Sequence, residues 1–136
     1  MKESLDLKTI INVAPPIIYN AWLDSHLHSE MTGGEAKINS KVGSTFTAWD
    51  GYITGTNIEL RPNQKIIQNW RTSEFNPNDE SSILTIVLKE IENGTELTLI
   101  HKNIPEGQTQ YKNGWVENYF EPMKNYFENS NAINRS

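Results

Sequence analysis

Residues 108–128 have the pattern of one long amphipathic helix. Placed at about 100° per residue, their apolar side chains gather on one half of the circumference and their polar side chains on the other. The apolar half holds Tyr111, Trp115, Val116, Tyr119, Phe120, Pro122, Met123, Tyr126 and Phe127. So wide an aromatic face needs a broad, concave surface to pack against. Pro122 lies inside the helix and removes one backbone hydrogen bond, so we expect a kink there.

The earlier chain supplies such a surface, because its apolar residues recur at every second position. Period two predicts strands that bury one face. Dipeptides Asp50-Gly51 and Asn93-Gly94 favour tight hairpin turns between neighbouring strands. We expect strands at 5–13, 44–49, 52–60, 65–72, 83–89 and 97–101, with a further short strand at 35–39.

Two short helices are expected between the first strand and the rest. Pro15 and Pro16 stop the strand and suit the first turn of a helix. Asp24 or Ser25 can cap a second helix, which Gly33 ends. The chain therefore predicts an α+β fold: a curved antiparallel sheet of about six or seven strands wrapped around a long C-terminal helix.

Length and charge narrow the function classes. A chain of 136 residues makes one domain, which we place at 1–128, followed by a flexible tail at 129–136. A net charge of −5 without a basic cluster argues against nucleic acid. The chain has no cysteine, no secretory signal pattern and no segment of membrane-spanning length, so we expect a cytoplasmic protein.

Several short motifs, in this order and spacing, resemble one family. They are Ala14-Pro15-Pro16, Tyr19-Asn20-Ala21-Trp22, Met31-Thr32-Gly33-Gly34, Val42-Gly43, Trp49-Asp50-Gly51-Tyr52-Ile53, Gln68-Asn69-Trp70-Arg71, His101-Lys102-Asn103-Ile104-Pro105, Gly114-Trp115 and Tyr119-Phe120-Glu121-Pro122-Met123-Lys124. Together they resemble single-domain relatives of the C-terminal domain of the activator of heat-shock protein 90 ATPase. This family is part of the START-like (SRPBCC) superfamily, and the resemblance runs from about Leu5 to Phe127.

The resemblance implies a helix-grip fold with a cavity between the sheet and the long helix. In the wider superfamily that cavity holds lipids, polyketides or other apolar molecules. From strand parity, helix phase and the resemblance, we expect the cavity to be lined by Trp22, Phe46, Ile58, Trp70, Leu84, Leu99, His101, Trp115, Tyr119 and Met123. The leading hypothesis is non-catalytic binding of a small apolar ligand, with no metal or cofactor.

Two alternatives stay open. The first is a protein-interaction module that contacts a chaperone, which predicts apolar residues on the outer sheet face or near the loop 73–79. The second is a cavity enzyme such as a cyclase, with His101 and a tyrosine as acid and base.

His26 and His28 diverge by about 200° on a helix and cannot chelate a metal together. The face of the sheet on which Trp49 lies is ambiguous, because strand parity places this large apolar residue with Thr45 and Thr47, opposite Phe46 and Ala48.

Overall fold

A computed structural model describes residues 2–135 of the chain. Six strands form one antiparallel sheet in the order β1-β6-β5-β4-β3-β2. Their bounds are β1 (Glu3–Ile11), β2 (Thr45–Ala48), β3 (Ile53–Arg61), β4 (Lys65–Thr72), β5 (Ser82–Ile91) and β6 (Gly94–Ile104). The expected α+β architecture is confirmed, with six strands, while residues 35–39 contribute one bridge, between Lys37 and Thr47, instead of a strand.

Two short helices follow β1, as expected. Helix α1 (Pro15–Trp22) begins with prolines in its first turn, where a missing N–H costs nothing. Helix α2 (Ser25–Thr32) is capped by the Asp24 carboxylate, which accepts from the Leu27 N–H at 2.9 Å. Gly33 ends α2 at φ +89°, a conformation that costs glycine little.

The C-terminal helix is continuous but changes its winding. It consists of α3 (Tyr111–Trp115), the π-helical turn η1 (Val116–Phe120) and α4 (Glu121–Arg135). In the π turn the Glu121 N–H bonds the Val116 carbonyl five residues back. Pro122 follows immediately and offers no N–H to the Asn118 carbonyl, which accounts for a wider turn at this point. The helical backbone runs on to Arg135; the expected flexible tail stays a prediction.

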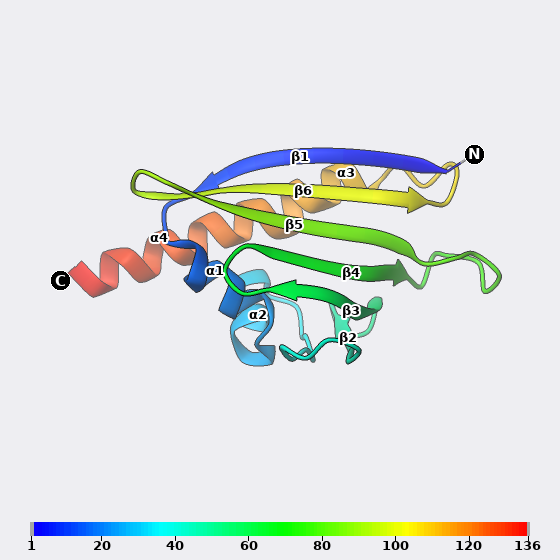
Figure 1. Cartoon of the computed structure of the whole chain (residues 1–136), viewed down its shortest axis with the longest axis horizontal. Coiled ribbons are helices and arrows are strands. Elements are labelled where there is room, and N and C mark those ends of the chain that lie inside the picture. The colour runs from blue at the N-terminus through cyan, green and yellow to red at the C-terminus, as the bar shows by residue number, and fades with distance from the viewer. Residues whose placement is uncertain (1, 136) are drawn as a thin grey trace.

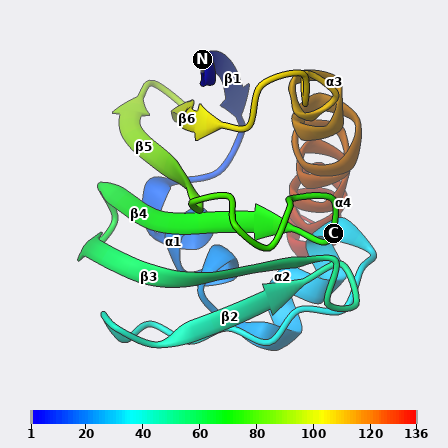
Figure 2. The same cartoon turned by 90° about the vertical axis from the view of Figure 1, so that its right-hand side faces the viewer.

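The sheet curves around the long helix. Figure 2 shows the strands sweeping from β1 round to β2, with α3 and α4 along the open side of the curve. Helix α2 packs against α4 and the π turn, whereas α1 packs against α2 and β5 (Figure 1). Helix α3 faces the end of β4, where the Trp70 ring contacts the rings of Tyr111 and Trp115.

One apolar core joins the sheet to the helices. Its most deeply buried aliphatic side chains come from the inward faces of β1, β4, β5 and β6 and from α1, α2 and α4. These side chains are Ile11, Ile18, Met31, Ile66, Leu84, Ile86, Leu97, Leu99, Ile104 and Met123. Because direct cross-strand partners share a face, the register that sets Leu84 opposite His101 and Ile86 opposite Leu99 keeps all four inside.

Candidate functional site

A cleft of about 660 Å³ opens between the sheet and the first half of the long helix. Its volume lies in the range of small-molecule sites. The sheet side comes from the β2–β3 turn, β3 and β4, and the helix side from α3 and η1. The lining residues are Trp49, Tyr52, Ile53, Trp70, Gln110, Tyr111, Asn113, Gly114, Trp115, Glu117, Asn118 and Tyr119.

The helix presents its aromatic residues to the cleft at intervals of four. Tyr111, Trp115 and Tyr119 are buried and follow one another along one face, as i and i+4 positions do. Trp70 reaches them from β4, with ring centroids 5.3 Å from Trp115 and 5.1 Å from Tyr111. Tilted and edge-to-face contacts at these distances are favourable and hold each ring in place. The wall of the cleft is therefore rigid and aromatic.

His101 lies behind this wall and fixes the Trp115 ring. The indole N–H of Trp115 donates to His101 Nδ1 at 3.1 Å, so the His101 proton is on Nε2 and is donated to Ser82 Oγ at 2.7 Å. The Ser82 hydroxyl in turn donates to the Trp70 carbonyl, also at 2.7 Å. Burial lowers the pKa of His101 to about 3. The imidazole is therefore neutral. The Trp115 indole N–H, the His101 Nε2–H and the Ser82 hydroxyl each have an acceptor.

A second histidine, His28, holds the Tyr119 hydroxyl. His28 Nδ1 is 2.8 Å from the Trp22 carbonyl, which can only accept, so Nδ1 carries the proton. Its Nε2 therefore accepts from the Tyr119 hydroxyl at 3.0 Å. Burial lowers the pKa of His28, with the Trp22 carbonyl opposing the shift, and raises that of Tyr119.

The histidine–tyrosine pair that we predicted for His101 is wrong. Both ring nitrogens of His101 are already occupied by Trp115 and Ser82, and the tyrosine contact belongs to His28 instead. His28 and Tyr119 are 91 residues apart, and no periodicity within either helix indicates that they meet. Because Ser82 gives its proton to a backbone carbonyl, Ser82 and His101 do not form an activated nucleophile and base.

Trp49 lies at the end of the cleft beside Tyr119 and combines two unusual features. Its backbone is left-handed, at φ +50°, which is rare for a bulky residue. Its indole N–H is buried but makes no hydrogen bond within the described chain. That N–H lies beside the Tyr119 hydroxyl, where it favours the ionised form of the hydroxyl and so opposes the rise in the Tyr119 pKa that burial causes.

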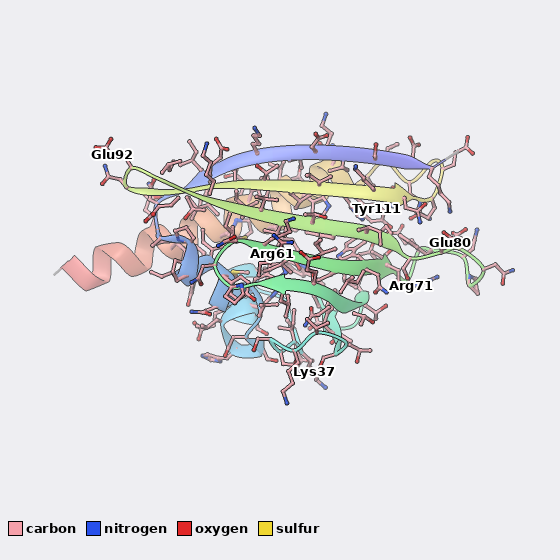
Figure 3. The ribbon with its side chains drawn as sticks, in the orientation of Figure 1. Lys37, Arg61, Arg71, Glu80, Glu92 and Tyr111 are labelled. Atoms are coloured by element: carbon pink, nitrogen blue, oxygen red, sulfur yellow. The ribbon has the colours of Figure 1, made fainter. Side chains whose placement is uncertain are left out.

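Polar groups surround the opposite end of the cleft. The Tyr111 hydroxyl is 2.7 Å from Thr72 Oγ1 and 2.7 Å from the Gln108 side-chain oxygen. The Tyr52 hydroxyl donates to the Glu74 carboxylate. Figure 3 shows Tyr111 at the same end of the molecule as Arg71, near the β4–β5 loop. Arg71 fixes that loop by donating to the Asp79 and Asn76 carbonyls at 3.0 and 2.9 Å.

The predicted lining residues divide into three groups. Trp70, Trp115 and Tyr119 line the cleft. Buried in the surrounding core, rather than at the cleft, are Trp22, Phe46, Leu84, Leu99, His101 and Met123. Ile58 is 44% exposed, so its predicted inward orientation is wrong. Its position lies at a β-bulge between Asn57 and Glu59, and its parity is that of the outward Thr54 and Thr56.

The described side chains offer no cluster of metal ligands: among them, no three histidine, aspartate or glutamate groups converge. The same part of the chain holds no helix that is both long and apolar enough to cross a membrane.

Comparisons with known proteins place this geometry in a family. Solved structures include an HSP90 activator from Plasmodium falciparum, with 30% sequence identity and a TM-score of 0.82 over 89% of this chain and 93% of that one. A protein from Mesorhizobium loti shares the fold at 20% identity and a TM-score of 0.79, covering 93% of this chain and 98% of that one.

Curated relatives are longer. The chain is 24% identical over 132 residues to the activator of 90 kDa heat shock protein ATPase homolog of Dictyostelium discoideum, and 25% identical over 124 residues to homolog 1 of Homo sapiens. These matches cover 96% and 90% of this chain but only 34% and 36% of the relatives. The model of the family "Activator of Hsp90 ATPase homolog 1-like protein" matches residues 12–128. The chain, with its helix-grip fold, therefore belongs to that family.

Proposed function

We propose that this protein binds a small, mostly apolar molecule in the cleft between β3, β4 and the first half of the C-terminal helix, without transforming it. The observation that carries the proposal is the cleft itself: about 660 Å³, walled by rings of Trp49, Tyr52, Trp70, Tyr111, Trp115 and Tyr119. Small-molecule sites are typically apolar and largely preformed, with a few fixed polar groups. Tyr119 and Tyr111 supply such groups, each already held by a protein partner.

A pair of variants at Gly114 tests this proposal. Gly114 lines the cleft, and a Cβ added there would meet nothing closer than 3.8 Å, so a side chain extends into open space. Gly114→Leu should fill part of the cleft and weaken binding of 2-methylnaphthalene at least about tenfold, because the probe loses its apolar contacts. Gly114→Ala is the matched control and should change the affinity less than about twofold.

Binding is measured by NMR titration of the indole N–H signals. Failure of 2-methylnaphthalene to bind the wild-type protein, or equal binding by wild type and Gly114→Leu, would contradict the proposal. Native mass spectrometry of protein purified from its own cells provides an independent test, because a bound molecule adds a defined mass that Gly114→Leu should lose.

A second candidate function is contact with an Hsp90-type chaperone through the outer face of the sheet. That face carries a band of half-exposed β-branched residues on three neighbouring strands, formed by Ile67, Ile83, Thr85, Val87 and Ile100. The strand register sets Ile67 opposite Thr85 and Thr85 opposite Ile100, so the band is continuous. The name of the Plasmodium falciparum relative, an HSP90 activator, favours this partner.

The chaperone hypothesis is tested by introducing a charge into the band. Ile83→Lys should reduce co-sedimentation with purified Hsp90 at least about tenfold, because an unpaired ammonium would be buried at the contact. Ile17→Lys is the control, since Ile17 is exposed on α1, away from the sheet. If wild type and Ile83→Lys bind Hsp90 equally, or neither binds, the outer face is not the chaperone contact.

A further inference from the structure

We propose that the molecule bound in the cleft is an organic cation, with an apolar body between the sheet and the helix and an ammonium group beside the Glu117 carboxylate. This inference rests on the proposed ligand-binding function and names the ligand class. The ammonium group lies at the mouth of the cleft, by which we mean its exposed lining residues Tyr52, Gln110, Asn113, Glu117 and Asn118.

The lining of the cleft carries negative charge without positive charge. Glu117, on the π turn, is a lining residue, and none of the lining residues that the structure describes is a lysine, an arginine or a histidine. Arg71 follows the lining residue Trp70 in β4, but strand alternation turns it to the other face, where loop carbonyls hold its guanidinium. An anionic ligand would therefore find no counter-charge in the cleft, whereas a cationic ligand would.

The Glu117 carboxylate is free to pair with a ligand. Within the described part of the chain it makes no ion pair and no side-chain hydrogen bond, and Glu117 is exposed. An ammonium group beside it would form a charge-assisted hydrogen bond, which is stronger than a neutral one. The neighbouring lining residues Asn113 and Asn118 have amide oxygens, which can accept from the other N–H groups of a primary ammonium.

A second carboxylate adds to the negative potential of the cleft. The hydroxyl of Tyr52, at the mouth, donates to the Glu74 carboxylate. Burial is the main cause of the raised pKa of both Tyr52 and Tyr111, and the negative charge of Glu74 raises each pKa further. The field of Glu74 therefore reaches two lining residues, where it also favours a positive charge on the ligand.

Aromatic rings at and near the mouth suit the same cation. Tyr52 is 36% exposed and Trp49 is half-buried, whereas Trp70, Trp115 and Tyr119 are buried deeper in the wall. The face of an aromatic ring attracts a cation through its negative potential. An ammonium group at the mouth keeps part of its hydration and so avoids the cost of full burial, while its apolar body lies against the buried rings.

The test compares three probes that share a naphthalene ring and differ in charge. They are 2-(aminomethyl)naphthalene, which is a cation at pH 7, the neutral 2-methylnaphthalene, and the anion 2-naphthoate. NMR titration of the indole N–H signals measures their binding. At about 20 mM salt the wild-type protein should bind the cation at least about fivefold more tightly than the anion. At about 500 mM salt this preference should shrink, because salt screens the charge of an exposed carboxylate.

Glu117→Gln removes the charge and keeps the size of the side chain. It should weaken binding of the cation about three- to tenfold and change binding of 2-methylnaphthalene less than about twofold. Glu92→Gln is the matched control, because it makes the same change in net charge in the exposed turn between β5 and β6, at the opposite end of the molecule from Tyr111 (Figure 3). It should leave the preference for the cation unchanged.

Gly114→Leu shows whether the cation binds in the cleft, and it should weaken all three probes. If 2-methylnaphthalene binds in the cleft but the cation and the anion bind equally, the inference is wrong and the cleft function stands. The same conclusion follows if Glu117→Gln and Glu92→Gln change the preference equally, or if Gly114→Leu leaves binding of the cation unchanged. If none of the probes binds the wild-type protein, both the inference and the cleft function are wrong.

Discussion

The Tyr119 hydroxyl donates to Nε2 of His28 at 3.0 Å and so ties the C-terminal helix to α2, across 91 residues of sequence. Both groups are buried, and the other nitrogen of His28 is fixed by the Trp22 carbonyl. Water cannot replace either partner, so the bond contributes to stability and also sets the direction in which the Tyr119 oxygen faces the cleft.

Tyr119→Phe should lower the free energy of unfolding by about 1–3 kcal/mol, because His28 Nε2 is left as a buried acceptor without a donor. Urea denaturation measures the change. Tyr126→Phe is the control: the Tyr126 hydroxyl bonds Glu30 at 3.2 Å in an exposed position, and its loss should cost less than about 0.5 kcal/mol. Equal effects of the two substitutions would show that the His28 contact contributes nothing specific.

The buried histidines should make the fold sensitive to acid. The pKa of His101 falls to about 3 in the folded protein, against 6.5 unfolded, so between these values the unfolded chain binds a proton that the folded chain excludes. Stability is therefore complete above pH 6.5 and declines below it, at up to about 1.4 kcal/mol per pH unit for this residue. The lowered pKa of His28 acts in the same direction.

His101→Gln removes the titrating group while its amide can still accept from Trp115 and donate to Ser82. Urea denaturation at pH 7, 6, 5 and 4 should give a shallower loss of stability for His101→Gln than for the wild type. His26→Gln should follow the wild-type curve, because His26 is exposed. If the stability of His101→Gln fell with pH as steeply as that of the wild type, another residue would be responsible for the acid sensitivity.

Two glycines should respond in opposite ways to alanine. At Gly55 in β3 a Cβ would overlap the backbone carbonyl of Asn69 and the buried ring of Phe46. Gly55→Ala should therefore destabilise the fold by about 3 kcal/mol or more. At helical Gly114 the nearest atom is 3.8 Å away, and Gly114→Ala should stabilise by about 0.5–1 kcal/mol. Thermal unfolding of both variants measures the two effects. If both substitutions shift the unfolding midpoint in the same direction, the prediction is wrong.

Arg71 and Arg61 provide a matched pair of surface cations (Figure 3). Arg71 donates to two loop carbonyls and lies over the Phe75 ring at 5.4 Å, whereas Arg61 makes one exposed ion pair with Glu59. Arg71→Met should speed amide hydrogen exchange in residues 73–79 about tenfold, because the loop loses both anchors. Arg61→Met should leave exchange in that loop unchanged and cost at most about 1 kcal/mol.

Periodicity was sufficient for the parts of the fold that are regular. Helix phase placed Trp115 and Tyr119 on the face that lines the cleft, and strand parity placed Trp70 inside. The predicted strand 65–72 has the same bounds as β4. Burial of one face is a strong constraint on both elements, so the pattern of apolar residues carries this information.

Departures from regular backbone account for what the sequence did not predict. The side of Trp49 was ambiguous because its φ of +50° breaks the alternation of β2, and a bulky residue gives no signal for that conformation. Ile58 is exposed because it shares the outward parity of Thr54 and Thr56, and its apolar side chain alone is no sign of an inward position; the bulge between Asn57 and Glu59 changes the parity only of the residues that follow. The His28–Tyr119 contact depends on tertiary packing between distant helices, which no local pattern encodes.

The π turn at Val116–Phe120 means that the long helix carries one amino acid more than an α-helical path of the same length needs. If one exposed residue of this turn, such as Asn118, were removed, the turn would become α-helical and the segment after Pro122 would keep its orientation in the core. The extra residue therefore affects only the part of the helix that lines the cleft. Deleting one residue in this turn would therefore reshape the cleft and leave the hydrophobic core unchanged.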